Sequence, residues 1–421
     1  MKFGIIELLT LIGSLGFFIY GMKVMSDGIQ KVAGSKMRSI LSKMTSNRFL
    51  GITTGFILTA LLQSSSATTV MIVSFVNAGL LSLVESIGVI MGANIGTTIT
   101  AWLISLLGFK VKIASIALPI IAIGFPMMFS SKSNIKAWAE VLIGFALLFM
   151  GLDALKGSVP NLGAEELNFL KSYADMGIMS TLIFIGVGTI LTLVVQSSSA
   201  AMALTLVMCY EGYIPFELAA AMVLGENIGT TITANLAALV GNVHSKRAAR
   251  AHFIFNIFGV IWMIFAFQFF INSIDNYMIS NMDLSPVSSV GESVAVPIGL
   301  SIFHTTFNIL NVLFLVWFVP LISRTVIRMQ PSKGEIDEEF HLEHIGAGLM
   351  QTTELSVLEA QKEVIKFGEI TTRLFNMIPE LMKETNNKKF DELMKRIRKY
   401  EDITDKMEIE IADYLAKSAQ G

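Results

Sequence analysis

Two polar motifs each occur twice in this chain, and the second copy of each follows 133 residues after the first. Residues 63–67 read QSSSA, as do residues 196–200. Residues 92–101 read GANIGTTITA, and residues 225–234 read GENIGTTITA, with a single difference. All four segments lie within long apolar stretches. Two copies of one membrane unit, each with polar breaks at membrane depth, are typical of secondary transporters.

The composition is that of a membrane protein. Of the 421 residues, 53% are hydrophobic and 15% are charged, against about 25% charged in soluble domains. Apolar runs long enough to cross a bilayer as helices recur through roughly the first 325 residues. The chain is therefore predicted to be an all-α polytopic membrane protein in contact with the lipid bilayer.

Other classes have no support in the sequence. The net charge of −2 gives no reason to expect a nucleic-acid partner. No nucleophile elbow, zinc-ligand spacing or phosphate-binding glycine loop occurs, so the chain is not expected to be an enzyme.

Two apolar segments are too long for one crossing. Each carries QSSS near its middle, and each is expected to form a re-entrant helical hairpin, over 49–84 and 178–215. A double crossing that returns to its starting side is the alternative. The remaining apolar segments are 4–22, 85–108, 111–130, 137–156, 216–243, 251–272 and 297–322. They predict seven full crossings beside the two hairpins.

Loop charges give an orientation in a plasma or inner cell membrane. Loops rich in Lys and Arg are expected inside, and loops rich in Asp and Glu outside. The inside loops are 23–48, 131–136 and 244–250, and the outside loops are 157–177 and 273–296. Lys110 and Lys112, which fall outside, disagree. The N-terminus is then outside and the C-terminal tail cytoplasmic.

This topology predicts two inverted repeats, because each unit of helix, hairpin, helix and helix makes three crossings. The first repeat covers 1–136 and the second 137–272. An additional transmembrane helix lies in 273–330. A short helical tail covers 331–421, where apolar side chains at helical spacing predict two antiparallel helices joined at Asn386 and Asn387. The tail is expected to self-associate or to bind a regulatory partner.

The serine runs have the chemistry of an anion site. Serines are poor mid-helix residues but good N-caps, so we expect a helix ending near Leu62 and a new one starting at Ser65 or Ser66. The start of that half-helix presents free N–H groups and hydroxyls to an anion. Its twin lies at 196–199, and inverted repeats would aim both at one point. The alternative is that the serines only let helices pack closely.

The second motif is expected to be a broken helix in each repeat. Gly96 and Gly229 permit an unwound turn, whose carbonyls, with Asn and Thr oxygens, suit Na⁺. The alternative is a kinked helix whose hydroxyls bond back to the previous turn.

Few charges lie at membrane depth. Glu226 replaces Ala93 of the first copy and is a candidate cation ligand, proton carrier or partner of a neighbour. His252 with Asn256, and His304 with Asn308, each lie one helical turn apart; interhelical hydrogen bonding is favoured over a ligand role. Because Arg and Lys lie in the loops, an anionic substrate would need co-bound cations to offset its buried charge.

Together the two motifs and the segment His252-x-x-Phe255-Asn256 resemble the type II sodium-phosphate cotransporter family. The resemblance covers about residues 5–325. It implies phosphate sites at Ser64, Ser65, Ser66, Ser197, Ser198 and Ser199. It implies sodium-binding or hairpin-bracing roles for Gln63, Thr68, Asn94, Thr97, Thr98, Gln196, Asn227, Thr230 and Thr231, and we add Glu226 to this set.

Bacterial members of that family often carry a PhoU-like cytoplasmic tail. The tail here resembles part of such a domain, but it is shorter than a complete PhoU-like bundle. Glu401, Asp402 and Asp405 resemble its acidic metal-binding pattern, which implies a weak metal site.

The function expected from the sequence is Na⁺-coupled symport of inorganic phosphate into the cell by alternating access, with Na⁺ as the coupling ion. Two alternatives remain open. One is a Na⁺-coupled carrier of dicarboxylates or amino acids. The other is a phosphate sensor that signals through the tail.

Overall fold

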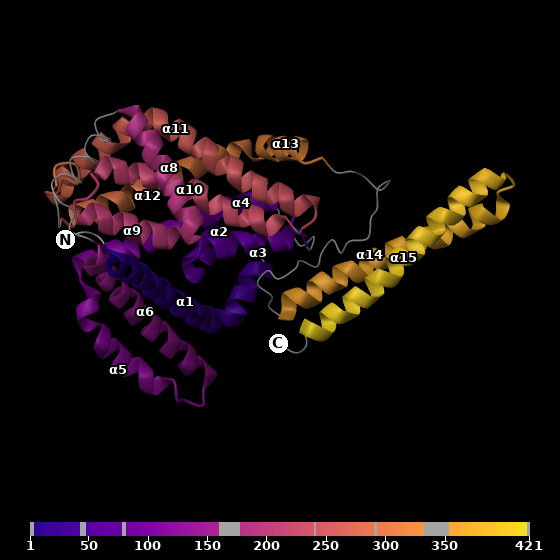
Figure 1. Ribbon diagram of the computed structural model, residues 1–421, viewed down its shortest axis with the longest axis horizontal. Coiled ribbons are helices and arrows are strands. Elements are labelled where there is room, and N and C mark those ends of the chain that lie inside the picture. The colour runs from indigo at the N-terminus through magenta and orange to yellow at the C-terminus, as the bar shows by residue number, and fades with distance from the viewer. Residues whose placement is uncertain are drawn as a thin grey trace.

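The computed structural model describes residues 4–42, 48–77, 81–159, 177–239, 241–289, 293–331 and 353–418. In these ranges the chain is helical and contains no strand (Figure 1). The α-helices are α1 (Ile5–Ser42), α2 (Arg48–Leu62), α3 (Ser65–Asn77), α4 (Leu83–Leu103), α5 (Ala117–Met127), α6 (Ser133–Ser158), α8 (Ile178–Val195), α9 (Ser198–Tyr210), α10 (Phe216–Ala238), α11 (Val243–Met282), α12 (Ala295–Leu315), α13 (Val319–Met329), α14 (Thr353–Lys383) and α15 (Asn387–Ser418). The all-α polytopic prediction is confirmed.

Six helical runs in the described residues are long and apolar enough to cross a bilayer. They are Ile5–Ala33, Leu83–Lys110, Ser133–Ser158, Ile178–Val195, Val243–Met282 and Ala295–Met329. Five of them match predicted crossings. The sixth is α8, an arm of the second predicted hairpin. Two predicted crossings do not qualify, 111–130 and 216–243, because α5 lies in a short helical run (Ile113–Met127) and α10 is interrupted by the polar motif.

Both long segments form a pair of helices broken at QSSS. In the first, α2 and α3 have 15 and 13 residues, fewer than the about 20 that span a bilayer. In the second, α8 and α9 have 18 and 13 residues. The bounds of α3 recur in α9 after 133 residues, so the sequence duplication extends to the helix ends.

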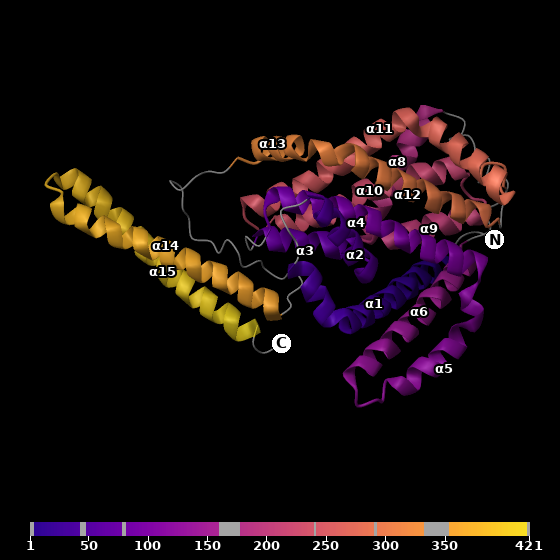
Figure 2. The same ribbon diagram turned by 180° about the vertical axis from the view of Figure 1, so that it is seen from behind.

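Helices α1 and α6 pack side by side with their backbones in close contact (Figures 1 and 2). A Cβ atom on Gly21 would lie 2.3 Å from the Leu148 nitrogen, and one on Gly28 would lie 2.7 Å from the Val141 nitrogen. The residue number rises along α1 as it falls along α6, so the two helices run antiparallel. Small residues permit such close approach in membrane bundles.

The contact between α2 and α4 is repeated residue by residue between α8 and α10. A Cβ on Gly92 would lie 1.9 Å from the carbonyl oxygen of Ile52. The same atom on Gly225 would lie 2.0 Å from the carbonyl oxygen of Ile185, at the equivalent position. The glycines of the second motif therefore serve close helix packing.

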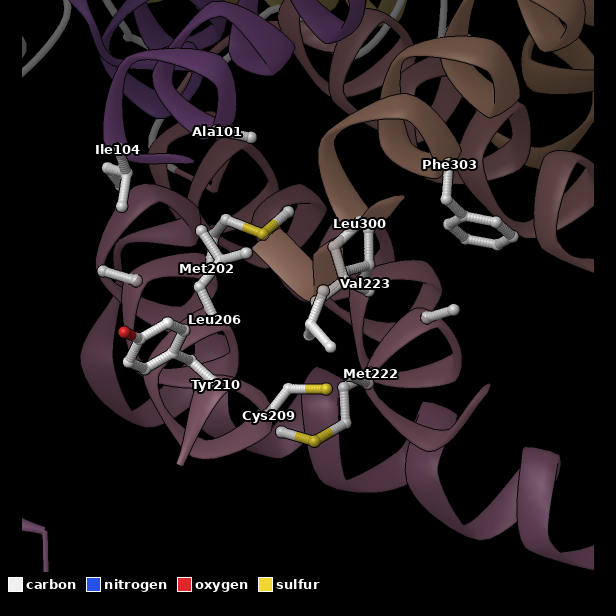
Figure 3. Close-up of a cluster of buried hydrophobic side chains, with 14 of the residues drawn as sticks. Ala101, Ile104, Met202, Leu206, Cys209, Tyr210, Met222, Val223, Leu300 and Phe303 are labelled. Carbon is white, nitrogen blue, oxygen red and sulfur yellow. The ribbon is translucent and has the colours of Figure 1, made fainter. Parts of the chain in front are cut away.

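The largest buried cluster lies where the second hairpin meets its neighbours (Figure 3). Met202 and Leu206 project from α9, Met222 from α10, and Leu300 and Phe303 from α12. All five are less than 4% exposed, so α9 is held in a packed setting behind its N-terminus.

The predicted domain limits need small corrections. The limit at 136/137 falls inside α6, and the limit at 272/273 falls inside α11, which runs on to its C-cap at Asp283. The predicted helix 297–322 is two helices, α12 and α13, joined by a 3₁₀ turn at Val316–Phe318. The predicted outside loop at 157–177 lies largely outside the described residues.

The tail forms the predicted pair of antiparallel helices, α14 and α15. Asn386 caps α15, because its side-chain oxygen accepts from the backbone N–H of Lys388 at 3.0 Å. Ile370 and Met377 of α14 pack against Tyr400 and Met407 of α15. The described part of the chain has no group of three or more acidic, Cys or His side chains able to hold a metal, so the predicted site at Glu401, Asp402 and Asp405 is wrong. All three carboxylates are exposed along α15 and point to water rather than to one another.

The tail should be less stable at high pH. Burial raises the pKa of Glu359 to about 7, although the Tyr414 hydroxyl donates a hydrogen bond to its carboxylate. The folded tail thus favours the protonated acid. This contribution to stability is complete below the unfolded value of 4.5 and is lost as the pH rises through 7. Hydrogen exchange of α14 and α15, corrected for intrinsic rates, should show more protection at pH 5 than at pH 8. Equal protection, or the same difference in Glu359→Gln, would contradict this assignment.

Candidate functional site

Each QSSS motif forms a sharp break between two half-helices, as predicted. Helix α2 ends at Leu62, and Gln63 takes a left-handed conformation with φ of 50°. Helix α3 begins at Ser65, and the Ser64 hydroxyl caps it by accepting from the N–H of Ala67 at 3.1 Å.

The second copy has the same local structure. Gln196 is left-handed with φ of 55°, and Ser197 accepts from the N–H of Ala200 at 3.2 Å. Helix α9 begins at Ser198. A left-handed glutamine is uncommon, and its recurrence shows that the same turn is built twice.

The two breaks meet. The hydroxyl oxygen of Ser65 lies 3.4 Å from that of Ser198, its equivalent in the second copy, and both side chains are buried. The first N–H groups of a helix have no partner within the helix. At each break the cap satisfies one of them, which leaves the N–H groups of the next two serines for a ligand. Two half-helix N-termini at one buried point form an anion site by their geometry and dipoles.

The bracing residues of the two copies differ. Gln63 is buried; its amide nitrogen donates to the carbonyl of Ala60 at 2.6 Å, and its oxygen accepts from Thr100 at 3.1 Å. Gln196 is exposed. Thr68 donates to the carbonyl of Ser64 at 3.0 Å and so supports the first cap.

The predicted broken helices are wrong. Both α4 and α10 run without interruption through the second motif. A π-helical stretch follows α4 at Ile104–Lys110, beyond the motif. The glycines serve helix packing here, since a Cβ on Gly96 would lie 2.6 Å from that of Thr59 and one on Gly229 would lie 2.6 Å from that of Thr192.

The hydroxyls of the second motif bond back to the preceding turn, as the alternative reading expected. Thr97 donates to the carbonyl of Ala93 at 3.1 Å, and Thr230 donates to that of Glu226 at 2.9 Å. Thr98 and Thr231 do the same over three residues, at 2.8 and 2.7 Å. Each hydroxyl oxygen keeps lone pairs that can still accept a cation.

The motif asparagines have different partners. Asn94 donates from its amide to the side-chain oxygen of Asn256 at 3.5 Å, which links α4 to α11. Asn227 donates to the carbonyl of Val223 at 3.0 Å within α10. Both are buried. The Asn94–Asn256 contact bears out one of the expected interhelical hydrogen bonds.

The two histidine–asparagine pairs bond along their own helices. Asn256 donates to the carbonyl of His252 at 3.0 Å, and Asn308 donates to that of His304 at 2.9 Å. Both imidazoles are buried, and in the described part of the chain their Nδ1 atoms have no hydrogen-bond partner.

Several threonines at the site were not predicted. Thr59 donates to Thr68 at 3.0 Å, and Thr100 donates to Gln63. Thr192 is the equivalent of Thr59, and its hydroxyl is buried without a partner among the described residues. A signal was available, because Thr59 and Thr192 are themselves a pair 133 residues apart.

The site has little positive charge. Helices α3, α8 and α9 contain no Lys or Arg, and in α2 only Arg48, at its first position, is basic. An anion here would be held by N–H groups and hydroxyls rather than by a basic side chain. Paired half-helices at a buried point in a polytopic bundle define a membrane transporter rather than an enzyme.

The chain belongs to the Na⁺/Pi-cotransporter family, whose model matches residues 17–157 and 167–281. It is similar to "Putative inorganic phosphate export protein YjbB" of Salmonella typhimurium, with 24% identity over 380 residues. That match covers 90% of this chain and 66% of the relative, so the chain spans just under two thirds of the relative's length.

Two further relatives match parts of the chain. "Uncharacterized protein YqeW" of Bacillus subtilis is 30% identical over 249 residues, which are 58% of this chain and 77% of the relative. Human "Sodium-dependent phosphate transport protein 2B" is 40% identical over 106 residues, 25% of this chain and 15% of the relative. No solved structure matches the chain.

Proposed function

We propose that this protein is a Na⁺-coupled transporter that takes inorganic phosphate into the cell, with phosphate bound between the two QSSS breaks. The observation that carries the proposal is the 3.4 Å approach of the Ser65 and Ser198 hydroxyls at two helix N-termini. Membership of the Na⁺/Pi-cotransporter family supports phosphate as the anion. Ser64, Ser66, Ser197 and Ser199 complete the cradle.

Sodium would offset the charge of the substrate. A phosphate anion held only by dipoles and hydroxyls would leave net negative charge buried, at a high free-energy cost. The oxygens of Thr97, Thr98, Thr230 and Thr231, with Asn94 and Asn227, are hard ligands in the two helices that flank the breaks. We propose that Na⁺ binds among them. The unpartnered Thr192 hydroxyl is a further candidate ligand.

Two end contacts support alternating access. At the end of α3, Asn77 accepts from the backbone N–H of Asn242 at 2.8 Å, and its carbonyl accepts from the Asn242 amide at 2.9 Å. At the end of α9, the ring of Tyr210 lies 4.6 Å from that of Phe109. These are equivalent pairs, because each residue of one lies 133 positions from a residue of the other. We call them the asparagine contact and the aromatic contact.

The two contacts lie at opposite ends of one helical run. Asn77 precedes the start of α4, and Phe109 lies near the end of the run Leu83–Lys110, about 40 Å away at 1.5 Å per residue. We propose that each contact opens in turn while the other stays closed. The antiparallel course of α1 and α6, which hold corresponding places in the two repeats, supports the inverted topology that this mechanism needs.

Phosphate export is the second candidate. It is favoured by the name of the YjbB relatives, which match 90% of this chain. The same site and the same two contacts would serve either direction, so the choice depends on which ion gradient drives the flux. We propose an orientation with the N-terminus outside and the tail in the cytoplasm.

Phosphate uptake into proteoliposomes tests the proposal. Uptake should require an inward Na⁺ gradient and stop when K⁺ replaces Na⁺. Ser65→Ala and Ser198→Ala should each lower uptake at subsaturating phosphate by about 10-fold or more, since a hydrogen bond to a charged group contributes about 1.5–3 kcal/mol. Ser74→Ala is the matched control, because that buried hydroxyl bonds to Val70 on its own helix. Flux that ignores Na⁺ would overturn the symport, and phosphate efflux from cells without Na⁺ dependence would favour export.

A further inference from the structure

One polar pair exists only in the second repeat. Thr205 of α9 donates from its hydroxyl to Oε1 of Glu226 in α10 at 2.7 Å. The equivalent residues of the first repeat, 133 positions earlier, are Ile72 and Ala93. All four side chains are at most 2% exposed. A buried apolar contact in one repeat is therefore a buried carboxyl contact in the other.

The Glu226 carboxyl lacks compensation for its charge. Its Oε2 atom is buried and has no hydrogen-bond partner in the described residues. The ion pair between Lys31 and Glu140 lies on other helices and offers it no counter-charge. An ionised carboxylate in this setting would be costly, and a bound positive charge would remove the cost.

The surrounding helices contribute few titratable groups. The elements packed on α10 are α3, α8, α9, α11 and α12. Among their described residues, α3 and α8 have none, α9 has Cys209 and Tyr210, and α12 has His304. Helix α11 has His252 in its buried part, and its other titratable side chains lie toward its two ends: His244, Lys246, Arg247, Arg250, Asp275 and Tyr277. On α10 itself, Glu217 lies in the first turn.

The pair is close to the proposed substrate site but does not touch it. Thr205 follows Ser198 by seven residues, about 10 Å along α9. The backbone carbonyl of Glu226 accepts from Thr230 within the second motif. A change of charge at Glu226 would therefore be felt at both the proposed phosphate site and the proposed sodium ligands.

We propose that Glu226 binds one proton during transport and that Thr205 holds its carboxyl in place, an inference that rests on the proposed function. The proton adds to Oε2 of the carboxylate on one side of the membrane and leaves the neutral acid on the other. A proton fits better than Na⁺, because Na⁺ needs several oxygen ligands at once. Here the hydroxyl of Thr205 spends its hydrogen on Oε1, and Oε2 is alone.

Counting protons per phosphate tests this assignment. Wild type and variants are reconstituted in vesicles that contain a pH dye, and proton and phosphate fluxes are measured together at pH 6 and pH 8. Glu226→Gln should move one proton fewer per phosphate than wild type. Because phosphate titrates equally in both samples, the difference reports the protein. Glu217→Gln is the matched control and should keep the wild-type ratio.

A second variant covers the case in which Glu226→Gln does not fold. Thr205→Ile combined with Glu226→Ala reproduces the pair found in the first repeat and should also lose one proton per phosphate. If the flux is too low to count, proton uptake on phosphate binding by the purified proteins measures the same difference.

The outcomes separate the two proposals. An unchanged proton count in both Glu226 variants overturns the proton site, as does an unchanged count with a 10-fold rise in the Na⁺ needed for half-maximal flux, which assigns Glu226 to sodium. Failure of the proposed function would show instead as wild-type protein without Na⁺-dependent flux.

Discussion

A covalent link across either end contact should abolish phosphate transport. With Cys209→Ser as background, one variant pairs Asn77→Cys with Asn242→Cys, and another pairs Phe109→Cys with Tyr210→Cys. The wild-type partners already touch in this structure, so a short thiol cross-linker can join the cysteines. If each contact must open once per cycle, either link should stop flux almost completely, and a reducible linker should restore it on reduction.

The aromatic contact needs a separate control. Lys156 lies 4.0 Å from the ring of Phe109 and donates to the carbonyl of Gly108 at 2.9 Å, so losing the ring disturbs more than one interaction. Single-cysteine variants treated with the same reagent show the cost of substitution and labelling alone. Full transport by cross-linked protein at either end would show that this end does not open.

Gly92→Ala should destabilise the fold more than most single substitutions. The new Cβ would lie 1.9 Å from the carbonyl oxygen of Ile52, so α2 and α4 would have to separate along their whole contact. Overpacking of a rigid contact costs about 1–3 kcal/mol, and a backbone atom cannot move aside as a side chain can. We expect a cost of about 3 kcal/mol or more, seen as a lower midpoint of thermal unfolding in detergent.

The chain supplies both a repeat and a control for this substitution. Gly225→Ala meets the Ile185 carbonyl at 2.0 Å and should have a similar cost. Gly186→Ala on α8 meets no atom within 4 Å and should be neutral or slightly stabilising, because alanine favours helix by about 1 kcal/mol. Equal midpoints for all three variants would mean that these helices can separate at little cost.

The QSSS breaks could be predicted from the sequence because their chemistry is local. Three serines after a long apolar run favour a cap over a continued helix, and the structure places the start of α3 at Ser65. That the two breaks meet was predicted from symmetry alone. The distance between Ser65 and Ser198 depends on the packing of every helix between them.

The second motif could not be settled by local reasoning. A glycine next to Asn and Thr fits an unwound turn, but it fits close helix packing equally well. Only the position of Ile52, and of Thr59 beside Gly96, decides between them. The pairing of Thr205 with Glu226 was also missed, because a threonine in an apolar run gives no signal until its neighbour is known.

The two end contacts close with different physics, and this has a consequence for the working cycle. The asparagine contact is made of hydrogen bonds that water can replace one for one, whereas the aromatic contact hides apolar surface. Hydrophobic association weakens on cooling, while a hydrogen-bonded contact has no such dependence on apolar hydration. The two open forms are therefore unequal in energy, and their ratio shifts with temperature. Sequence duplication has produced a machine whose two half-cycles respond differently to cold.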